Sequence, residues 1–221
     1  MIKTNAGKGV RRSGMNIAIL GGSFDPPHKG HVAIANKLIR LFHFNSVWLM
    51  PCYQHPFNKN LSDPNKRLEM TKYLEKGPTK VSDLEIRKKT ISYTIDTLRE
   101  LAKKHPQDKF SWIIGTDQVD SFTKWKEWKK IINNFKLIIV PRTGFKKAEI
   151  KLQEISKQVL FPKNIISIDQ KKFPPIYVSS KLTRERIKRN KSSTDSVLDK
   201  SISNMVPKRV KDYIIENKLY S

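Results

Sequence analysis

Short apolar runs alternate with amphipathic segments along most of this chain. Residues 17–20 form a continuous apolar run, which is typical of a strand buried on both faces of a parallel sheet. Apolar residues then recur at helical spacing, at Val32, Ala35, Leu38, Ile39 and Phe42. The pattern predicts a strand, a tight turn and a helix that begins near His28.

The same alternation continues to the end of the chain. Further apolar runs predict strands at 46–51, 80–86, 109–115, 136–142 and 164–169. Helices are predicted at 93–105, 180–190 and 207–218, and another begins at Asp63–Pro64 and carries Leu68 and Leu74. A polar loop is expected at 189–196. Strands that alternate with helices predict an α/β fold with a doubly wound, mainly parallel sheet and helices on both faces.

Length and composition favour one soluble domain. A chain of 221 residues can bury one sizeable core, so we expect a flexible basic leader at 1–14 and a single domain at 15–221. No stretch approaches the roughly 18 apolar residues that span a bilayer. The leader lacks the apolar centre of a signal peptide. The single cysteine, Cys52, excludes an intramolecular disulfide and suits a reducing cytoplasm. The sequence leaves open whether the chain forms a homo-oligomer.

The charge balance is strongly basic. The chain has 44 Lys and Arg residues against 20 Asp and Glu residues, a net charge of +24, which attracts polyanions. The basic residues are nevertheless spread along the whole chain, and no zinc-finger or RNP signature is present. We therefore expect solvated basic helix faces and no dedicated nucleic-acid partner, although a basic nucleic-acid-binding protein stays an alternative.

The connection "LGGSFDPPHKGH" (20–31) carries the first candidate chemistry. Gly21 and Gly22 allow close backbone approach, and the start of the following helix exposes unpaired N–H groups, as in phosphate-binding turns. His28 and His31 lie one helical turn apart at the positive end of the helix dipole. Two imidazoles there can donate to an anion without a permanent charge. The alternatives are solvated loop histidines or a metal-binding pair, and no cysteine or carboxylate cluster completes a metal site.

The remaining loops expected near this connection also carry polar motifs. In a parallel sheet, ligands bind at the carboxyl ends of the strands, near the topological switch point. The loops that fall there are 21–31, 51–60, 86–94, 115–125, 142–147 and 178–184, which include "SYT", "GTDQVDSFTKW", "PRTG" and "VSSKLTR".

These motifs in this order resemble a known family. "GGSFDPPHKGH" (21–31) resembles the first motif of the HxGH nucleotidyltransferases, and "VSSKLTRERI" (178–187) resembles their second signature. "SYTIDTL", "GTDQVDSFTKW" and "VPKRVKDYI" are similar to segments of bacterial nicotinate-nucleotide adenylyltransferases. The resemblance covers about 16–218 and implies a Rossmann-like fold.

The resemblance implies transfer of the adenylyl group of ATP to nicotinate mononucleotide, giving deamido-NAD and pyrophosphate. His28, His31 and Arg184 would be the catalytic residues, with Mg²⁺ bound mainly through the ATP phosphates. The ATP-binding residues it implies are Gly21, Gly22, Ser23, Phe24, His28, His31, Gly115, Asp117, Ser179 and Arg184. Those for nicotinate mononucleotide are Thr94, Trp125, which would stack on the pyridine ring, and Arg142.

Three positions depart from the family pattern. Lys181 stands where a small hydroxyl residue is usual, and Thr183 where an aliphatic residue is usual. Asn58 stands where relatives commonly have a lysine, and the neighbouring Lys59 can take over that charge. Another HxGH enzyme, such as a pantetheine-phosphate adenylyltransferase or a cytidylyltransferase, is the nearest alternative.

Overall fold

The protein is described by a computed structural model that covers residues 13–57, 60–142, 148–173, 176–190 and 195–220. Most of the expected leader, and the Asn58 and Lys59 positions, therefore lie outside the described residues.

The strands within these ranges form one parallel sheet. They are β1 (Asn16–Gly22), β2 (Ser46–Pro51), β3 (Thr79–Val81), β4 (Lys109–Gly115), β5 (Lys136–Val140) and β6 (Ile165–Ser167). Their order across the sheet is β3-β2-β1-β4-β5-β6, and every neighbouring pair is parallel. The order reverses direction between β1 and β4, so the switch point, where such sheets bind ligands, lies at the carboxyl end of β1.

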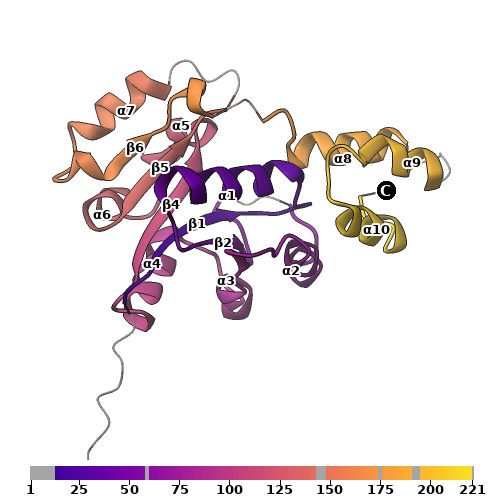
Figure 1. The fold of residues 1–221 in the computed structure, drawn as a ribbon, viewed down its shortest axis with the longest axis horizontal. Coiled ribbons are helices and arrows are strands. Elements are labelled where there is room, and N and C mark those ends of the chain that lie inside the picture. Colours follow the sequence, from indigo (N-terminus) through magenta and orange to yellow (C-terminus); the bar gives the residue numbers. More distant parts are fainter. Residues whose placement is uncertain (1–12, 58–59, 143–147, 174–175, 191–194, 221) are drawn as a thin grey trace, which may run out of the picture.

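Helices cover both faces of the sheet (Figure 1). Those described are α1 (Lys29–Phe42), α2 (Pro64–Lys72), α3 (Leu84–Lys88), α4 (Thr94–Lys104), α5 (Val119–Phe122), α6 (Trp128–Asn134), α7 (Ala148–Ser156), α8 (Ser180–Arg189), α9 (Asp195–Ile202) and α10 (Lys208–Glu216). None of these helices is both long and apolar enough to cross a membrane.

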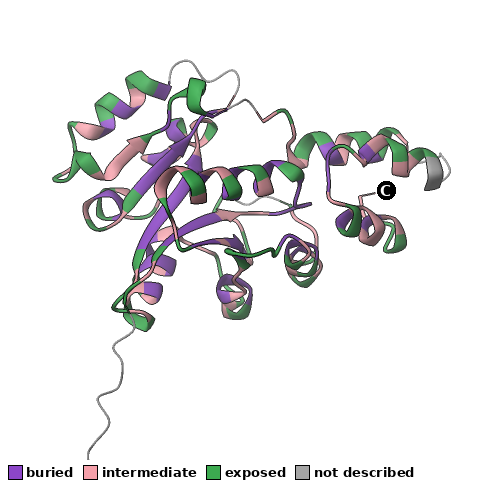
Figure 2. Ribbon diagram, in the orientation of Figure 1, coloured by how far each residue is buried: buried purple, intermediate pink, exposed green. Residues whose placement is uncertain are grey.

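Alternate residues of the central strands face two separate cores. In β1, Ala18 and Leu20 belong to a cluster with α1 and α8–α10, whereas Ile17 and Ile19 belong to a cluster with α4–α7. The four central strands β2, β1, β4 and β5 are accordingly mostly buried (Figure 2). This two-sided burial confirms the predicted doubly wound α/β fold, since a strand covered on both faces must be apolar at consecutive positions.

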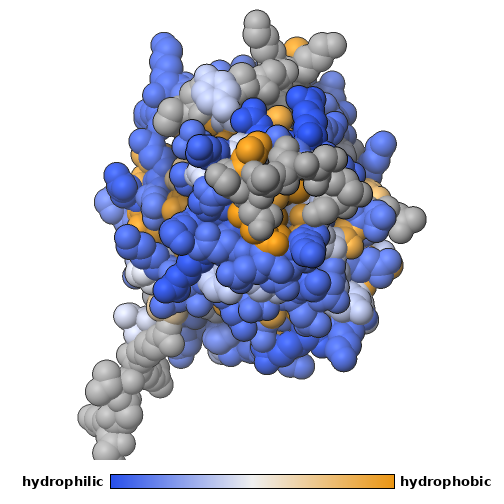
Figure 3. All heavy atoms as spheres, turned by 90° about the vertical axis from the view of Figure 1, so that its right-hand side faces the viewer, coloured by the Kyte–Doolittle hydropathy of each residue, from blue (hydrophilic) through white to orange (hydrophobic). Residues whose placement is uncertain are grey.

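Helices α8–α10 lie together beside the carboxyl end of β1 (Figure 1). α9 packs against both α8 and α10, and α10 packs against α2. The outer face of this side of the molecule is mostly hydrophilic, with a small hydrophobic group near its centre (Figure 3). The last part of the chain is thus brought close to the first strand–helix connection.

Most predicted elements are confirmed, and one strand prediction is wrong over most of its length. The segment 80–86 was expected as a strand, but pairing with β2 ends at Val81 and the chain turns into α3. Leu84 and Ile86 are both buried, and their i, i+2 spacing is the source of the error. At the expected loop 189–196, residues 191–194 lie outside the described part, and Asp195 already begins α9.

Candidate active site

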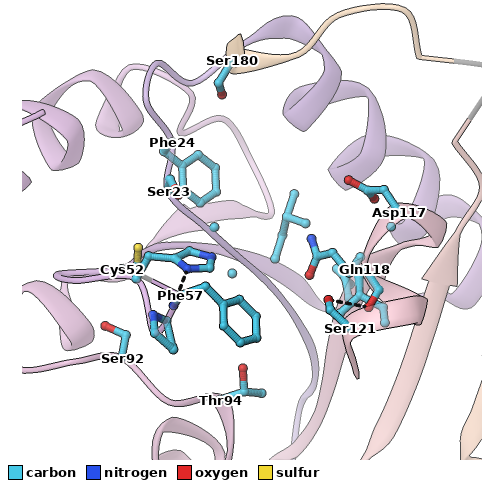
Figure 4. Close-up of a pocket in the computed structure, with 18 of the residues that line it drawn as sticks. Ser23, Phe24, Cys52, Phe57, Ser92, Thr94, Asp117, Gln118, Ser121 and Ser180 are labelled. Atoms are coloured by element: carbon cyan, nitrogen blue, oxygen red, sulfur yellow. Dashed lines mark hydrogen bonds between the residues drawn. The ribbon is translucent and has the colours of Figure 1, made fainter. Parts of the chain in front are cut away.

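A cavity of about 820 Å³ opens at the carboxyl ends of the strands around the switch point. It is lined by the loops after β1, β2, β4 and β5 and by the starts of α4 and α8. Figure 4 shows Asp117, Gln118 and Ser121 on one side of it and Phe57 and Thr94 on another. Every site residue predicted from the sequence lines this one cavity. Segments as distant as 21–31 and 179–184 are therefore brought together, as the parallel sheet predicts.

The two histidines form a stacked pair at the start of α1. His28 is the residue that caps α1, and the ring of His31 lies 3.7 Å from the ring of His28. The backbone N–H of His28 donates to Nδ1 of His31 at 3.0 Å. With Nδ1 of His31 accepting, the proton of the neutral ring must sit on Nε2. The ring of Phe24 packs on His31 at 4.5 Å and closes the other side of the pair.

Both imidazoles are neutral in the folded protein. Burial, and then the positive charge of Arg142, lower the pKa of His28 from its ordinary value of 6.5 to about 3. Burial also holds the pKa of His31 well below 6.5, with His28 and Arg142 adding to the effect. In the described residues, Nδ1 of His28 is buried without a hydrogen-bond partner. The pair therefore offers polar ring atoms to a ligand without carrying charge of its own.

Gly21, at the end of β1, makes room for a side chain of the cavity wall. Gly21 and Gly22 are the last residues of β1, paired with Met50 and Pro51, so the turn begins later than expected, at Ser23. A Cβ on Gly21 would lie 2.2 Å from the ring of Trp112 on β4. The close approach predicted at Gly21 is thus to a neighbouring strand's side chain.

Gly115 ends β4 beneath an ion pair. The Arg142 Nε atom lies 3.3 Å from the Asp117 Oδ1 atom, and a Cβ on Gly115 would lie 2.2 Å from that same oxygen. The backbone N–H of Arg142 donates to the Thr116 hydroxyl at 2.9 Å, which ties the loop after β5 to the loop after β4. Since Arg142 also lowers the pKa of both histidines, its charge acts on the histidine side of the cavity as well.

The second signature (178–187) is hydrogen-bonded directly to the histidine loop. Ser179 caps α8, where its hydroxyl accepts from the N–H of Leu182 and keeps its own O–H to donate. The Ser180 hydroxyl donates to the carbonyl of Pro26 at 2.8 Å. An Nη1–H of Arg184 donates to the carbonyl of Asp25. These contacts place Ser179 and Arg184 on the α8 side of the cavity, across from the strands.

The two departures in that signature have different consequences. Thr183 is fully buried, and its hydroxyl donates to the carbonyl of Ser179 one turn earlier at 2.9 Å. A threonine thereby replaces the usual aliphatic residue without leaving its hydroxyl unpaired. Lys181 is highly exposed and lies 3.9 Å from Glu185, and it also lines the cavity. Its ammonium is a flexible charge at the rim of the cavity.

The start of α4 and the segment after β4 form the other end of the cavity. Thr94 is the first residue of α4, so the unpaired N–H groups of a helix N-terminus lie here. Lys126 donates to Asp96 at 2.8 Å and holds the Trp125 segment against the first turn of α4. Trp125 packs on Phe122 with ring centres 5.2 Å apart. Among the residues described, its indole Nε1 is buried and has no hydrogen-bond partner.

Arg67 is a functional position that the sequence analysis missed. It is fully buried in α2, in the helix predicted from the Asp63–Pro64 start and from its leucines. Its guanidinium donates to the carbonyls of Ser23 (2.8 Å), Cys52 (2.7 Å), Tyr53 (2.8 Å) and Ser62 (2.9 Å). One cation thus joins the loops after β1 and β2. A lone arginine inside a helical pattern carries no sequence signal for this role.

Glu85 is a second position in the cavity wall that the sequence did not reveal. It is buried in α3, and its Oε1 accepts from the Thr97 hydroxyl at 2.6 Å. Burial raises the pKa of Glu85, while hydrogen bonds from Thr97 and Ser92 oppose that rise. The Ser92 hydroxyl in turn accepts from the N–H of Tyr53 at 3.1 Å. Misreading 80–86 as a strand concealed this carboxylate.

Cys52 lies in the cavity wall directly after β2. It is the only cysteine of the sequence, and its side chain is buried. Burial raises the pKa of its thiol. It is therefore a protonated, weakly reactive thiol beside the Arg67 network.

Across the described ranges, no group of three or more His, Cys, Asp or Glu side chains is arranged to hold a metal ion. Asp117 is paired with Arg142, and Glu85 is paired with Thr97. This donor set would fit a divalent metal ion that is held mainly by the phosphates of a bound substrate.

Comparisons with known proteins agree with the fold. The cytidylyltransferase-like family matches residues 19–194. A probable nicotinate-nucleotide adenylyltransferase of Bacillus licheniformis is 34% identical over 208 residues, covering 92% of this chain and 97% of that protein. The nicotinate-nucleotide adenylyltransferase of Bacillus subtilis is 33% identical over the same shares. The solved Plasmodium falciparum nicotinic acid mononucleotide adenylyltransferase, complexed with NaAD, superimposes with a TM-score of 0.74 at 24% identity, over 93% of this chain and 97% of that one.

Fold and cavity together define a nucleotidyltransferase of the cytidylyltransferase-like class. The predicted HxGH and second-signature residues meet at its switch point. Within that class, the chain belongs to the nicotinate-nucleotide adenylyltransferase family.

Proposed function

We propose that this protein transfers the adenylyl group of ATP to nicotinate mononucleotide, giving deamido-NAD and pyrophosphate. The observation that carries the proposal is near-full-length similarity to nicotinate-nucleotide adenylyltransferases, combined with one cavity that contains all the matching site residues. A 5′-phosphate oxygen of the mononucleotide attacks the α-phosphorus of ATP. The bond from that phosphorus to the bridging oxygen breaks, and pyrophosphate leaves.

The histidine pair and Arg184 would stabilise the charge that grows on the phosphates. His28 and His31 enter the reaction neutral, so they contribute hydrogen bonds that strengthen as the leaving group becomes more negative. Arg184 and the O–H of Ser179 hold phosphate oxygens from the α8 side of the cavity. In-line positioning between these two groups supplies most of the catalysis that phosphoryl-type transfer needs.

The adenosine and pyridine groups would occupy opposite ends of the cavity. The Asp117 carboxylate, which lies above Gly115 and is paired with Arg142, would accept from ribose hydroxyls. Thr94, at the start of α4, presents N–H groups to the pyridine carboxylate, and Trp125 stacks on the ring. Mg²⁺ is the expected divalent ion, because phosphate oxygens and water satisfy its preference for hard ligands.

Selectivity between nicotinate and nicotinamide mononucleotide tests this assignment. The N–H groups at the start of α4 favour a carboxylate over an amide, whose own NH₂ would face other donors. Stacking on Trp125 holds both rings alike. A charge-assisted contact plus a mismatched donor is worth roughly 2 to 4 kcal/mol, which corresponds to a factor of about thirty to a thousand in kcat/KM.

The experiment measures pyrophosphate release from ATP or CTP with a set of acceptors at fixed Mg²⁺. The acceptors are nicotinate mononucleotide, nicotinamide mononucleotide, phosphopantetheine and phosphocholine. We expect turnover with ATP and nicotinate mononucleotide, and loss of turnover when a chelator removes the metal. Equal kcat/KM for the two pyridine nucleotides would refute the pyridine assignment. Preferred use of another acceptor would assign the protein to a different member of its class.

A further inference from the structure

Asp25 is a buried residue of the histidine loop with contacts to three other segments. It is buried, with 3% of its surface exposed, and it lies three residues before His28. One carboxylate oxygen accepts from the N–H of Ser62 at 3.2 Å, and the other accepts from the hydroxyl of Tyr220 at 2.7 Å. Its backbone carbonyl accepts from Arg184. The contacts of Asp25 therefore link both phosphate-binding motifs to the far end of this sequence.

Tyr220 reaches Asp25 through an unusual backbone path. α10 ends at Glu216, and the chain then turns with left-handed φ angles of 48° at Lys218 and 68° at Tyr220. Bulky residues rarely adopt such angles unless tertiary contacts hold them there. The N–H of Leu219 donates to the carbonyl of Ile214 at 3.0 Å and fixes this turn against the helix. The turn directs the Tyr220 side chain back toward the loop after β1.

We infer that Tyr220 is a positioning residue of the active site, which acts through Asp25 on Arg184 and on the loop that carries His28. A buried carboxylate keeps a single orientation only while donors hold it, and Tyr220 supplies one of the two donors that the described residues give it. The backbone carbonyl of Asp25 accepts a hydrogen bond from Arg184. A change in the orientation of Asp25 would therefore move the guanidinium that binds phosphate. The inference rests on the proposed function, in which Arg184 and His28 contact ATP.

The donor state of Tyr220 supports this role. Burial raises the pKa of the Tyr220 hydroxyl, and the neighbouring Asp25 raises it further. The hydroxyl is therefore protonated throughout the neutral range and always able to donate to the carboxylate.

The test removes this single hydroxyl with Tyr220→Phe. Tyr213→Phe is a matched control, because the Tyr213 hydroxyl also donates to a carboxylate, that of Glu69, at 2.9 Å, but at an exposed site outside the cavity. We expect Tyr220→Phe to lower kcat for adenylyl transfer about tenfold, with KM for nicotinate mononucleotide within twofold of the parent. Tyr213→Phe should keep parental kcat. Both are measured at a temperature where far-ultraviolet circular dichroism shows full folding.

A double-variant comparison checks that the effect passes through Asp25. In a chain that already carries Asp25→Ala, adding Tyr220→Phe should change kcat less than twofold. If Asp25→Ala does not fold, the comparison of kcat between Tyr220→Phe and Tyr213→Phe still tests the inference. Parental kcat in Tyr220→Phe, or an equal loss in Tyr213→Phe, would overturn the inference.

A binding measurement with Mg–ATP alone, without nicotinate mononucleotide, distinguishes failure of this inference from failure of the proposed function. Calorimetric titration with Mg–ATP should give a weaker Kd, by about threefold, for Tyr220→Phe and parental binding for Tyr213→Phe. If the parent binds Mg–ATP but does not use nicotinate mononucleotide, the proposed function fails. The difference in Kd for Mg–ATP between Tyr220→Phe and Tyr213→Phe then still tests the positioning role of Tyr220. If both variants bind Mg–ATP as the parent does, the positioning role is refuted.

Discussion

The neutral state of His28 predicts a specific dependence of stability on pH. In the unfolded chain the imidazole has its ordinary pKa of 6.5, whereas burial and Arg142 lower the pKa in the folded protein to about 3. Below about pH 7 the unfolded state therefore binds more protons, and folding loses stability as the pH falls toward 3. At pH 5.5 the unfolded ring is about 90% protonated and the folded ring is neutral. The difference costs about 1.4 kcal/mol relative to pH 7.5.

The variant His28→Asn isolates this contribution. Asparagine is a good residue at a helix N-cap, so α1 keeps its start while the titrating group is removed. Free energies of unfolding are measured with urea at pH 7.5 and pH 5.5 for parent and variant. The loss of stability between the two pH values should be smaller in the variant by about 1.4 kcal/mol. An equal loss in both proteins would refute the conclusion that His28 is buried in its neutral form.

Four further variants test other parts of the site. His28→Ala and His31→Ala should each lower kcat by a factor corresponding to about 2 to 4 kcal/mol while circular dichroism shows a folded protein, and near-parental turnover would remove that histidine from the mechanism. Arg184→Lys should fold but lose roughly 1.5 to 3 kcal/mol in kcat/KM for ATP, because a lysine ammonium cannot form the paired hydrogen bonds that a planar guanidinium makes with phosphate oxygens. Parental kcat/KM for ATP would contradict this role of Arg184. Arg67→Met should lower the free energy of unfolding by about 3 kcal/mol or more, since four carbonyls lose their donor; a loss below 1 kcal/mol in urea unfolding would contradict the network.

The sequence was most informative where a pattern has one physical explanation. The run at 17–20 is apolar at consecutive positions because both faces of β1 are covered, and this predicted the strand and its place in the sheet. The family motifs predicted the residues that line the cavity, since parallel strands bring their carboxyl-end loops together. The side chain for which Gly21 makes room could not be predicted, because the Trp112 ring beside it comes from a strand and lies 91 positions further along the chain.

Contacts between distant polar groups were outside the reach of the sequence pattern. Arg67 looks like a surface residue of an ordinary helix, and only the fold shows it beneath two loops. Glu85 was assigned to a strand because Leu84 and Ile86 alternate with it, whereas a five-residue helix buries all three. Tyr220 gives no signal at all, because its partner Asp25 lies 195 positions earlier.

The single thiol at the cavity wall makes the natural chain a ready-made chemical reporter. Since Cys52 is buried and burial raises its pKa, maleimides and disulfide reagents should label the free protein slowly and at one position only. Cyanylation of that sulfur would attach a small infrared-active group beside the Ser23 and Tyr53 carbonyls held by Arg67. Its vibrational frequency would then record, without any engineered mutation, how the walls around the switch point respond when each nucleotide enters.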